Sequence, residues 1–384
     1  MPSPVEFPPD HMFLYKPIPG VQYGGCRALV WLPRAKDRSQ PGSSGNVRGA
    51  AAPLALMYHG GAFQTGSALD IPYAQVRYLL DRGVVVVSFS YRLLPHVDMT
   101  AIISDLLDSY KYVQSQTGLR ADLHKAGALI DIDPRRCAAL GWSAGGSSVI
   151  YLAAAIEQAN QAHPDDPPLP PLQCIAPTYP LVRLVFDEPL SKWDRALQSN
   201  PFLKRYWDQL MAEPCGTDHR LDASKMLLAS EAIFGVDGRP PVPGILSAED
   251  SRLAYVTQAS TRDRPGEYIV RVDGNLGSIM CGTDAPFPDE MHPINLVTPT
   301  FPATCVVMAD ADQLVPPSQS QELFDRLQAL GVDSKFVVAK GMGHGPAEAH
   351  QTDPAWPEGN DWWENAIRPS LDFVLDRISA TSEA

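Results

Sequence analysis

The sequence lacks several features that mark particular classes of protein. None of its six cysteines forms a C-x-x-C pair, which argues against a zinc knuckle or a dense disulfide framework and favours free, buried thiols. It has no basic run, and its formal net charge is −13, which disfavours nucleic acid and anionic membranes as partners. Its first ten residues contain neither a basic segment nor an apolar run, so we expect no secretory signal and a cytoplasmic protein.

Residues 137–156 carry no charge and are about as long as a bilayer-spanning helix. Glycines and serines interrupt the middle of this stretch. The pattern therefore predicts a buried strand, a sharp turn and a buried helix rather than a membrane span.

Apolar runs typical of strands alternate with segments that have helical periodicity. We predict strands at residues 27–32, 54–58, 84–89, 136–140, 304–309 and 335–339, and helices at 73–82, 99–116, 144–159, 319–330 and 360–378. Such alternation predicts an α/β fold with a mostly parallel, doubly wound sheet, whose ligand sites lie at the carboxyl ends of the strands.

One long segment departs from this alternation. Residues 178–302 are rich in proline, tryptophan and methionine and contain only short helical patterns. An unstructured loop of that length is very unusual inside a compact domain. We therefore expect a core domain formed by residues 1–177 and 303–384, with residues 178–302 inserted as a helical cap.

Residues 141–145, Gly-Trp-Ser-Ala-Gly, fit the pattern G-x-S-x-G. An apolar strand is predicted just before them and an alanine-rich helix just after, which is the setting of a nucleophilic serine on a sharp strand-to-helix turn. A glycine-rich turn with an incidental serine is the alternative. The flanking elements favour Ser143 as the nucleophile.

Residues 59–63, His-Gly-Gly-Ala-Phe, follow another predicted strand. Acyl transfer needs backbone N–H donors aimed at the developing oxyanion, and small residues let the backbone approach it. A tight turn that requires glycine for its dihedral angles is the alternative interpretation.

Candidates for an acid and a base follow two late strands. Asp310 and Asp312 come directly after the strand at 304–309, and we favour Asp312 because Asp310 could cap the turn. His344 lies between glycines after the last predicted strand, whereas its rival His350 lies in a more polar stretch. The order Ser143, Asp312, His344 is the order of an α/β-hydrolase triad.

Taken together, these motifs and residues 91–96, Tyr-Arg-Leu-Leu-Pro-His, resemble the hormone-sensitive-lipase-like branch of the α/β-hydrolase superfamily, in the style of its fungal members. The resemblance implies a Ser143, Asp312, His344 triad. It also places the oxyanion donors at the backbone N–H groups of Gly60, Gly61, Ala62 and Ala144. In that family His59 supports the oxyanion loop rather than acting as a base.

The sequence departs from the family at three places. Ala62 stands where the family has a third glycine, Trp142 where it has aspartate, and Leu94-Pro95-His96 where it has Ala-Pro-Glu. Ala62 still offers a backbone N–H, so the departures affect the acyl pocket more than the oxyanion donors. Candidate pocket residues are the aromatic side chains Phe63, Trp142, Trp193, Phe202 and Trp207, although core packing is the more common role of such residues.

These observations favour a serine carboxylesterase that acts on a small or medium apolar ester and needs neither a metal nor a cofactor. One alternative is an amide or formamide hydrolase, because His-Gly-Gly followed by a non-glycine and an aromatic also resembles kynurenine-formamidase-like enzymes. Another is an enzyme of natural-product metabolism that uses the fold for cyclisation, condensation or elimination. A catalytically silent binding module is the fourth, and a homodimer is left open.

Overall fold

The computed structural model describes residues 7–19, 24–34, 51–63, 67–93, 97–184, 287–312, 314–345 and 359–379. Within these residues, eight strands form one sheet in the order β1-β2-β4-β3-β5-β6-β7-β8. The strands are β1 His11–Pro17, β2 Gly25–Trp31, β3 Ala52–Tyr58, β4 Val85–Phe89, β5 Ile132–Trp142, β6 Cys174–Thr178, β7 Ala303–Ala309 and β8 Ser334–Ala339. The pairs β1/β2 and β2/β4 are antiparallel, and the remaining neighbours are parallel.

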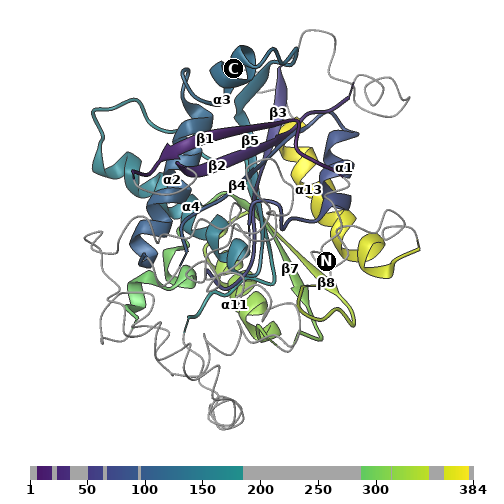
Figure 1. Cartoon of the computed structure of the whole chain (residues 1–384). Coiled ribbons are helices and arrows are strands. Elements are labelled where there is room, and N and C mark those ends of the chain that lie inside the picture. The colour runs from purple at the N-terminus through teal and green to yellow at the C-terminus, as the bar shows by residue number, and fades with distance from the viewer. Residues whose placement is uncertain are drawn as a thin grey trace, which may run out of the picture.

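Helices cover both faces of the sheet (Figure 1). One face packs against α2 Met99–Gln114, α3 Leu119–Lys125, α4 Ala144–Ala162 and α11 Pro317–Ala329. The other packs against α1 Tyr73–Leu80, the π-helical turn η5 Trp363–Ile367 and α13 Arg368–Ser379. This confirms the predicted doubly wound α/β architecture.

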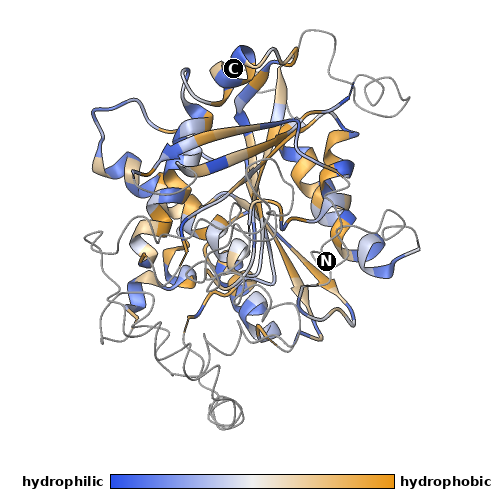
Figure 2. Ribbon diagram, in the orientation of Figure 1, coloured by the Kyte–Doolittle hydropathy of each residue, from blue (hydrophilic) through white to orange (hydrophobic). Residues whose placement is uncertain are grey.

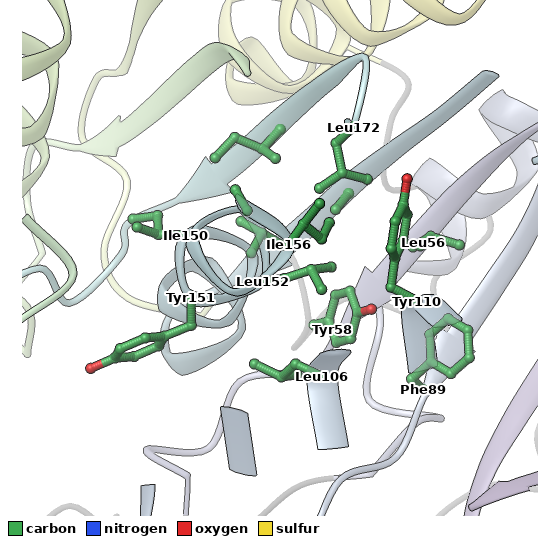
Figure 3. Packing of buried hydrophobic residues seen from close by; sticks show 14 of the residues in the cluster. Leu56, Tyr58, Phe89, Leu106, Tyr110, Ile150, Tyr151, Leu152, Ile156 and Leu172 are labelled. Atoms are coloured by element: carbon green, nitrogen blue, oxygen red, sulfur yellow. The ribbon is translucent and has the colours of Figure 1, made fainter. Parts of the chain in front are cut away.

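The two-sided burial follows from the side-chain period of each element. In β4, Val85 and Val87 point into one hydrophobic cluster and Val86 into the other, as expected where successive side chains alternate across a strand. Apolar residues colour the strands and the inner helix faces orange in Figure 2. Figure 3 shows Leu152 and Ile156 of α4 packed in the same cluster as Tyr58 of β3.

The uncharged stretch at 137–156 divides as predicted into the end of β5, a turn at Ser143 and the first part of α4. Among the helices that the structure describes, none has the length and hydrophobicity that a bilayer crossing requires. Cys26, Cys137, Cys174 and Cys305 are buried free thiols, as expected.

Residues 178–184 and 287–302, at the two ends of the expected cap, lie on the core. Thr178 is the last residue of β6, so the expected boundary between residues 177 and 178 falls within a strand. Leu181, Val182 and Ile294 are buried in the core, and the Ile294 N–H donates to the Val182 carbonyl over 3.2 Å. Residues 287–302 contain two short 3-10 helices, η3 Asp289–Met291 and η4 Pro293–Leu296, and Ile294 belongs to the second. Residues 185–286 lie outside the described residues.

A buried ion network ties β1 to α2. The Asp105 carboxylate is completely buried; its Oδ1 accepts from Lys16 Nζ at 2.5 Å and from the Arg92 guanidinium at 2.6 Å. Its Oδ2 accepts from the Arg92 backbone N–H at 3.0 Å and from Arg92 Nε at 2.7 Å. Asp105 therefore satisfies two cations that approach from different segments.

Replacing Asp105 by alanine should strongly destabilise the protein, because it leaves the buried Arg92 guanidinium without its anion. We expect the free energy of unfolding in urea to fall by about 3–5 kcal/mol. Asp108 is the matched control on the same helix: it also pairs with Lys16, at 2.6 Å, but its side chain is 36% exposed. Asp108→Ala should cost about 1 kcal/mol or less, and equal losses for the two variants would contradict this account.

Candidate active site

Ser143 lies on a sharp turn between β5 and α4. Its backbone has φ 56° and ψ −121°, a left-handed conformation that is strained for a residue with a Cβ. Its N–H donates to the Thr178 carbonyl at the end of the neighbouring strand β6, over 3.0 Å. The turn therefore holds the hydroxyl at the carboxyl edge of the sheet, at the N-terminus of α4.

The glycines of the motif are required by close backbone contacts. A Cβ at Gly141 would lie 2.0 Å from the Gly145 carbonyl oxygen, and one at Gly145 would lie 2.0 Å from the Tyr58 carbonyl oxygen. Gly146 is also confined, with the Thr178 carbonyl oxygen 3.0 Å from the position of its Cβ. The spacing of the motif thus reflects the crowding of β5, α4 and β3 around the serine.

Ser143, His344 and Asp312 form a continuous hydrogen-bonded relay. His344 Nε2 lies 2.9 Å from Ser143 Oγ, and His344 Nδ1 lies 2.6 Å from Asp312 Oδ2. Because an ionised carboxylate can only accept, the Nδ1–H donates to Asp312 and Nε2 is left to accept the serine O–H. The structure therefore brings together the three residues predicted as a triad.

The surroundings of the two aspartates separate their roles. Asp312 Oδ1 accepts the N–H groups of Leu314 at 2.8 Å and Val315 at 2.9 Å, which aims Oδ2 at the imidazole. Asp310 is exposed and accepts from the Gly341 N–H at 2.5 Å, so it braces the loop that leads to His344. The rival base, His350, lies outside the described residues.

The loop after β3 has an unusual run of left-handed residues. Gly61, Ala62 and Phe63 have φ values of 102°, 54° and 61°. Two of them carry a Cβ, so the loop is strained, as is common where a backbone is shaped for a ligand. Ala144 begins α4 beside Ser143, where N–H groups of the first helical turn are free to bind an anion. Gly60, Gly61, Ala62 and Ala144 are the predicted oxyanion donors.

His59, the first residue of this loop, is held by contacts with Gly60 and Tyr91. Its Nδ1 lies 2.8 Å from the Gly60 carbonyl oxygen, and its ring stacks on Tyr91 with centroids 4.3 Å apart. The Tyr91 hydroxyl donates to the His59 carbonyl over 2.9 Å. Burial lowers the pKa of His59 from 6.5 to about 4, so this imidazole is neutral at pH 7 and acts as a structural support.

The predicted pocket residues are placed only in part. Phe63 and Trp142 are almost completely buried within the two hydrophobic clusters, so they pack as core, and their role as pocket walls stays a prediction. Trp193, Phe202 and Trp207 lie outside the described residues. Across the described part of the chain, no three His, Cys, Asp or Glu side chains gather as a metal site would require.

The sequence pattern missed one residue of the site. The Tyr179 ring is buried, and its centroid lies 4.8 Å from that of His344. It follows β6, a strand that was not predicted, and no motif marks it. A positive backbone φ of 36° at this non-glycine residue is the signal that could have drawn attention to it, and only the structure reveals that signal.

Two family models match successive parts of the chain. The model of the alpha/beta hydrolase fold matches residues 55–250, which include the loop after β3 and Ser143. A model of the prolyl oligopeptidase family matches residues 288–368, which include Asp312 and His344. The first match alone spans just over half of the chain's 384 residues.

Curated relatives include synthases that are much longer than this chain. A non-reducing polyketide synthase from Acremonium egyptiacum is 25% identical over 342 residues, which are 85% of this chain and 14% of that protein. Methylphloroacetophenone synthase from Cladonia uncialis is 31% identical over 347 residues, 86% of this chain and 12% of that protein. The chain therefore spans only a small part of the length of these relatives.

Solved structures share the fold. An esterase from Pyrobaculum calidifontis matches with a TM-score of 0.52 and 19% identity, over 98% of this chain and 87% of that one. An acetyl ester-xyloside bifunctional hydrolase from Caldicellulosiruptor lactoaceticus matches with a TM-score of 0.52 and 14% identity, over 97% and 98% of the two chains. By its family match, sheet topology and motifs, the chain belongs to the α/β-hydrolase fold family, in its hormone-sensitive-lipase-like branch.

Proposed function

We propose that the protein is a serine hydrolase that cleaves a carboxylic ester through an acyl-enzyme formed on Ser143. The observation that carries this proposal is the unbroken relay from Ser143 Oγ through His344 to Asp312, with contacts of 2.9 and 2.6 Å. Contacts of this length are within the range needed for proton transfer in catalysis.

In the first half of the proposed reaction, Ser143 Oγ attacks the ester carbonyl while His344 Nε2 takes its proton. Asp312 keeps the imidazole in the correct tautomer and stabilises the imidazolium that forms. The backbone N–H groups of the loop after β3 and of Ala144 stabilise the oxyanion. The tetrahedral intermediate then collapses, and His344 gives its proton to the departing alcohol.

In the second half, water attacks the acyl-enzyme. His344 takes a proton from that water, and the new tetrahedral intermediate releases the carboxylic acid as Ser143 Oγ regains a proton from His344. We further propose that residues 178–302 act as a cap that supplies most of the acyl pocket. The ends of this segment, at residues 178–184 and 287–302, pack on the core close to α4.

A fluorophosphonate probe and a panel of p-nitrophenyl esters test this proposal. We expect turnover of the acetate and butyrate esters and stoichiometric labelling that removes it. Peptide mapping should place the label on Ser143, with Ser147 and Ser148 of the following helix α4 as internal controls, because both are buried and donate to backbone carbonyls. A folded protein that neither reacts with the probe nor hydrolyses any ester of the panel would refute the esterase proposal.

A second candidate substrate is a polyketide acyl group. Six of the curated relatives are non-reducing polyketide synthases, and an acyl thioester would enter the same Ser143 chemistry. Transfer of the acyl group from Ser143 to water would release a carboxylic acid, transfer to a nucleophile within the acyl group itself would give a cyclic product, and transfer to a second molecule would give a condensation product. Thioesters of β-ketoacyl chains with N-acetylcysteamine, analysed by mass spectrometry beside p-nitrophenyl butyrate and an aryl formamide, distinguish this candidate from simple ester and formamide hydrolysis.

A further inference from the structure

Tyr179 occupies a strained position next to the relay. It follows β6 directly, and its φ of 36° lies in the left-handed region that L-residues avoid. Its N–H donates to the Val307 carbonyl of β7 over 2.8 Å, while the preceding carbonyl, of Thr178, accepts from the N–H of Ser143. Backbone hydrogen bonds therefore tie Tyr179 to β7 and the residue before it, Thr178, to Ser143.

Buried side chains hold the chain that continues from Tyr179. Ser147 Oγ donates to the Leu181 carbonyl over 2.7 Å and accepts its N–H over 3.1 Å. Gln319 Oε1 accepts the N–H groups of Val182 at 2.7 Å and Arg183 at 3.0 Å. Strained backbone persists only where the surroundings over-determine it, and here α4 and α11 both do so.

The result of this strain is the placement of an aromatic ring on the imidazole. The Tyr179 side chain is 1% exposed, and its ring meets that of His344 at a centroid distance of 4.8 Å and an interplanar angle of 53°. The two glycines that flank His344 have open space beside them among the described residues: a Cβ at Gly345 would meet no atom within 4 Å, and one at Gly343 only the Ala311 oxygen at 4.0 Å.

The two hydrogen bonds of His344 leave one motion unopposed. They hold Nδ1 and Nε2, and so define an axis, but the imidazole can still rock about that axis with little loss of either bond. A ring packed against its side blocks that rocking. An aromatic ring also attracts a cation that lies close to its face. The imidazole of His344 becomes such a cation after it takes the serine proton.

We propose that Tyr179 is a positioning residue, whose ring fixes the plane of the His344 imidazole for proton transfer with Ser143. This inference rests on the serine hydrolase function proposed above. It assigns the role to the aromatic ring, so phenylalanine should serve and an aliphatic side chain should not. Leucine shares the backbone strain of tyrosine at this position, so the comparison isolates the ring.

The test compares Tyr179→Phe, Tyr179→Leu and a control, Tyr110→Leu, in p-nitrophenyl butyrate turnover. Tyr110 is also fully buried, but it lies in α2 and its hydroxyl donates to the Pro170 carbonyl, away from the relay. We expect Tyr179→Leu to lower kcat by about 10- to 100-fold at an unchanged KM, as small misplacements of catalytic groups do. Tyr179→Phe should restore most of kcat, and Tyr110→Leu should lower Tm without lowering kcat.

A readout independent of turnover separates this inference from the proposed function. The proton shared by His344 and Asp312 should give a far-downfield NMR resonance that is sharp in the wild type and in Tyr179→Phe but broadened in Tyr179→Leu. That pattern in a protein that hydrolyses no ester would sustain the positioning role while refuting the esterase. A folded Tyr179→Leu protein with unchanged kcat and an unchanged resonance would overturn the inference; if leucine prevents folding, Tyr179→Met replaces it in both measurements.

Discussion

Replacing Asp312 by asparagine should lower kcat for ester hydrolysis by about 10⁴-fold, the scale known for loss of the acid in such triads, while the fold stays intact. The reason lies in the two N–H groups, of Leu314 and Val315, that donate to Oδ1. In the variant they require the amide oxygen on that side. The amide NH₂ then faces His344 Nδ1 and forces the proton onto Nε2, so the imidazole can no longer accept from Ser143.

Asp310→Asn is the matched control for this prediction. It makes the same chemical change two residues away, where the side chain accepts from the Gly341 N–H and does not contact the imidazole. Its kcat should stay within a few-fold of wild type, whereas Ser143→Ala sets the floor of activity in the assay. Thermal unfolding of all three variants shows whether they are folded. Near-wild-type activity in Asp312→Asn would mean that Asp312 does not orient the base.

Replacing Gly145 by alanine should remove both activity and most of the folded protein. The added Cβ would lie 2.0 Å from the Tyr58 carbonyl oxygen and 2.7 Å from that of His59, and these are backbone atoms that cannot rotate away. Either α4 or the end of β3 must shift. That shift would separate Ser143 from the loop predicted to hold the oxyanion and open the packing between helix and sheet, at a cost of several kcal/mol, beyond the usual range for overpacking of about 1–3 kcal/mol.

Gly343→Ala is the control that separates this clash from a general intolerance of side chains near the site. Gly343 precedes His344, yet the nearest atom to its added Cβ is 4.0 Å away. The variant should express, unfold in urea at close to the wild-type midpoint, and hydrolyse p-nitrophenyl butyrate within a few-fold of wild type. A soluble, active Gly145→Ala protein would show that the elbow tolerates a wider separation than its contacts indicate.

The sequence was most informative about the site where chemistry and local structure require the same residues. Gly141 and Gly145 are needed for packing, as their close contacts show, and they flank Ser143 at a spacing that can be recognised. Asp312 and His344 were found because each follows the carboxyl end of a predicted strand, β7 and β8, where a parallel sheet collects its functional groups.

Elements with weak or contradictory local signals were not predicted. The strand β6 reads Cys-Ile-Ala-Pro-Thr, and a proline argues against a central strand because it cannot donate to the ladder. The structure accommodates Pro177 by a gap in the pairing with β7, which resumes at Thr178. The edge strand β1 is mostly half-buried, so its apolar alternation is faint. Because β6 was missed, Tyr179 had no structural context in the sequence.

The relay joins residues that are far apart in the sequence rather than neighbours within one motif. Ser143 and His344 are 201 positions apart in the sequence, and β7 and β8, which precede Asp312 and His344, join the sheet beyond β6. Contacts of high sequence separation carry the loop-closure entropy that slows folding. We therefore expect that, during refolding, the turn at Ser143 forms early with its own strand and helix, whereas its hydrogen bond to His344 forms only when β7 and β8 dock.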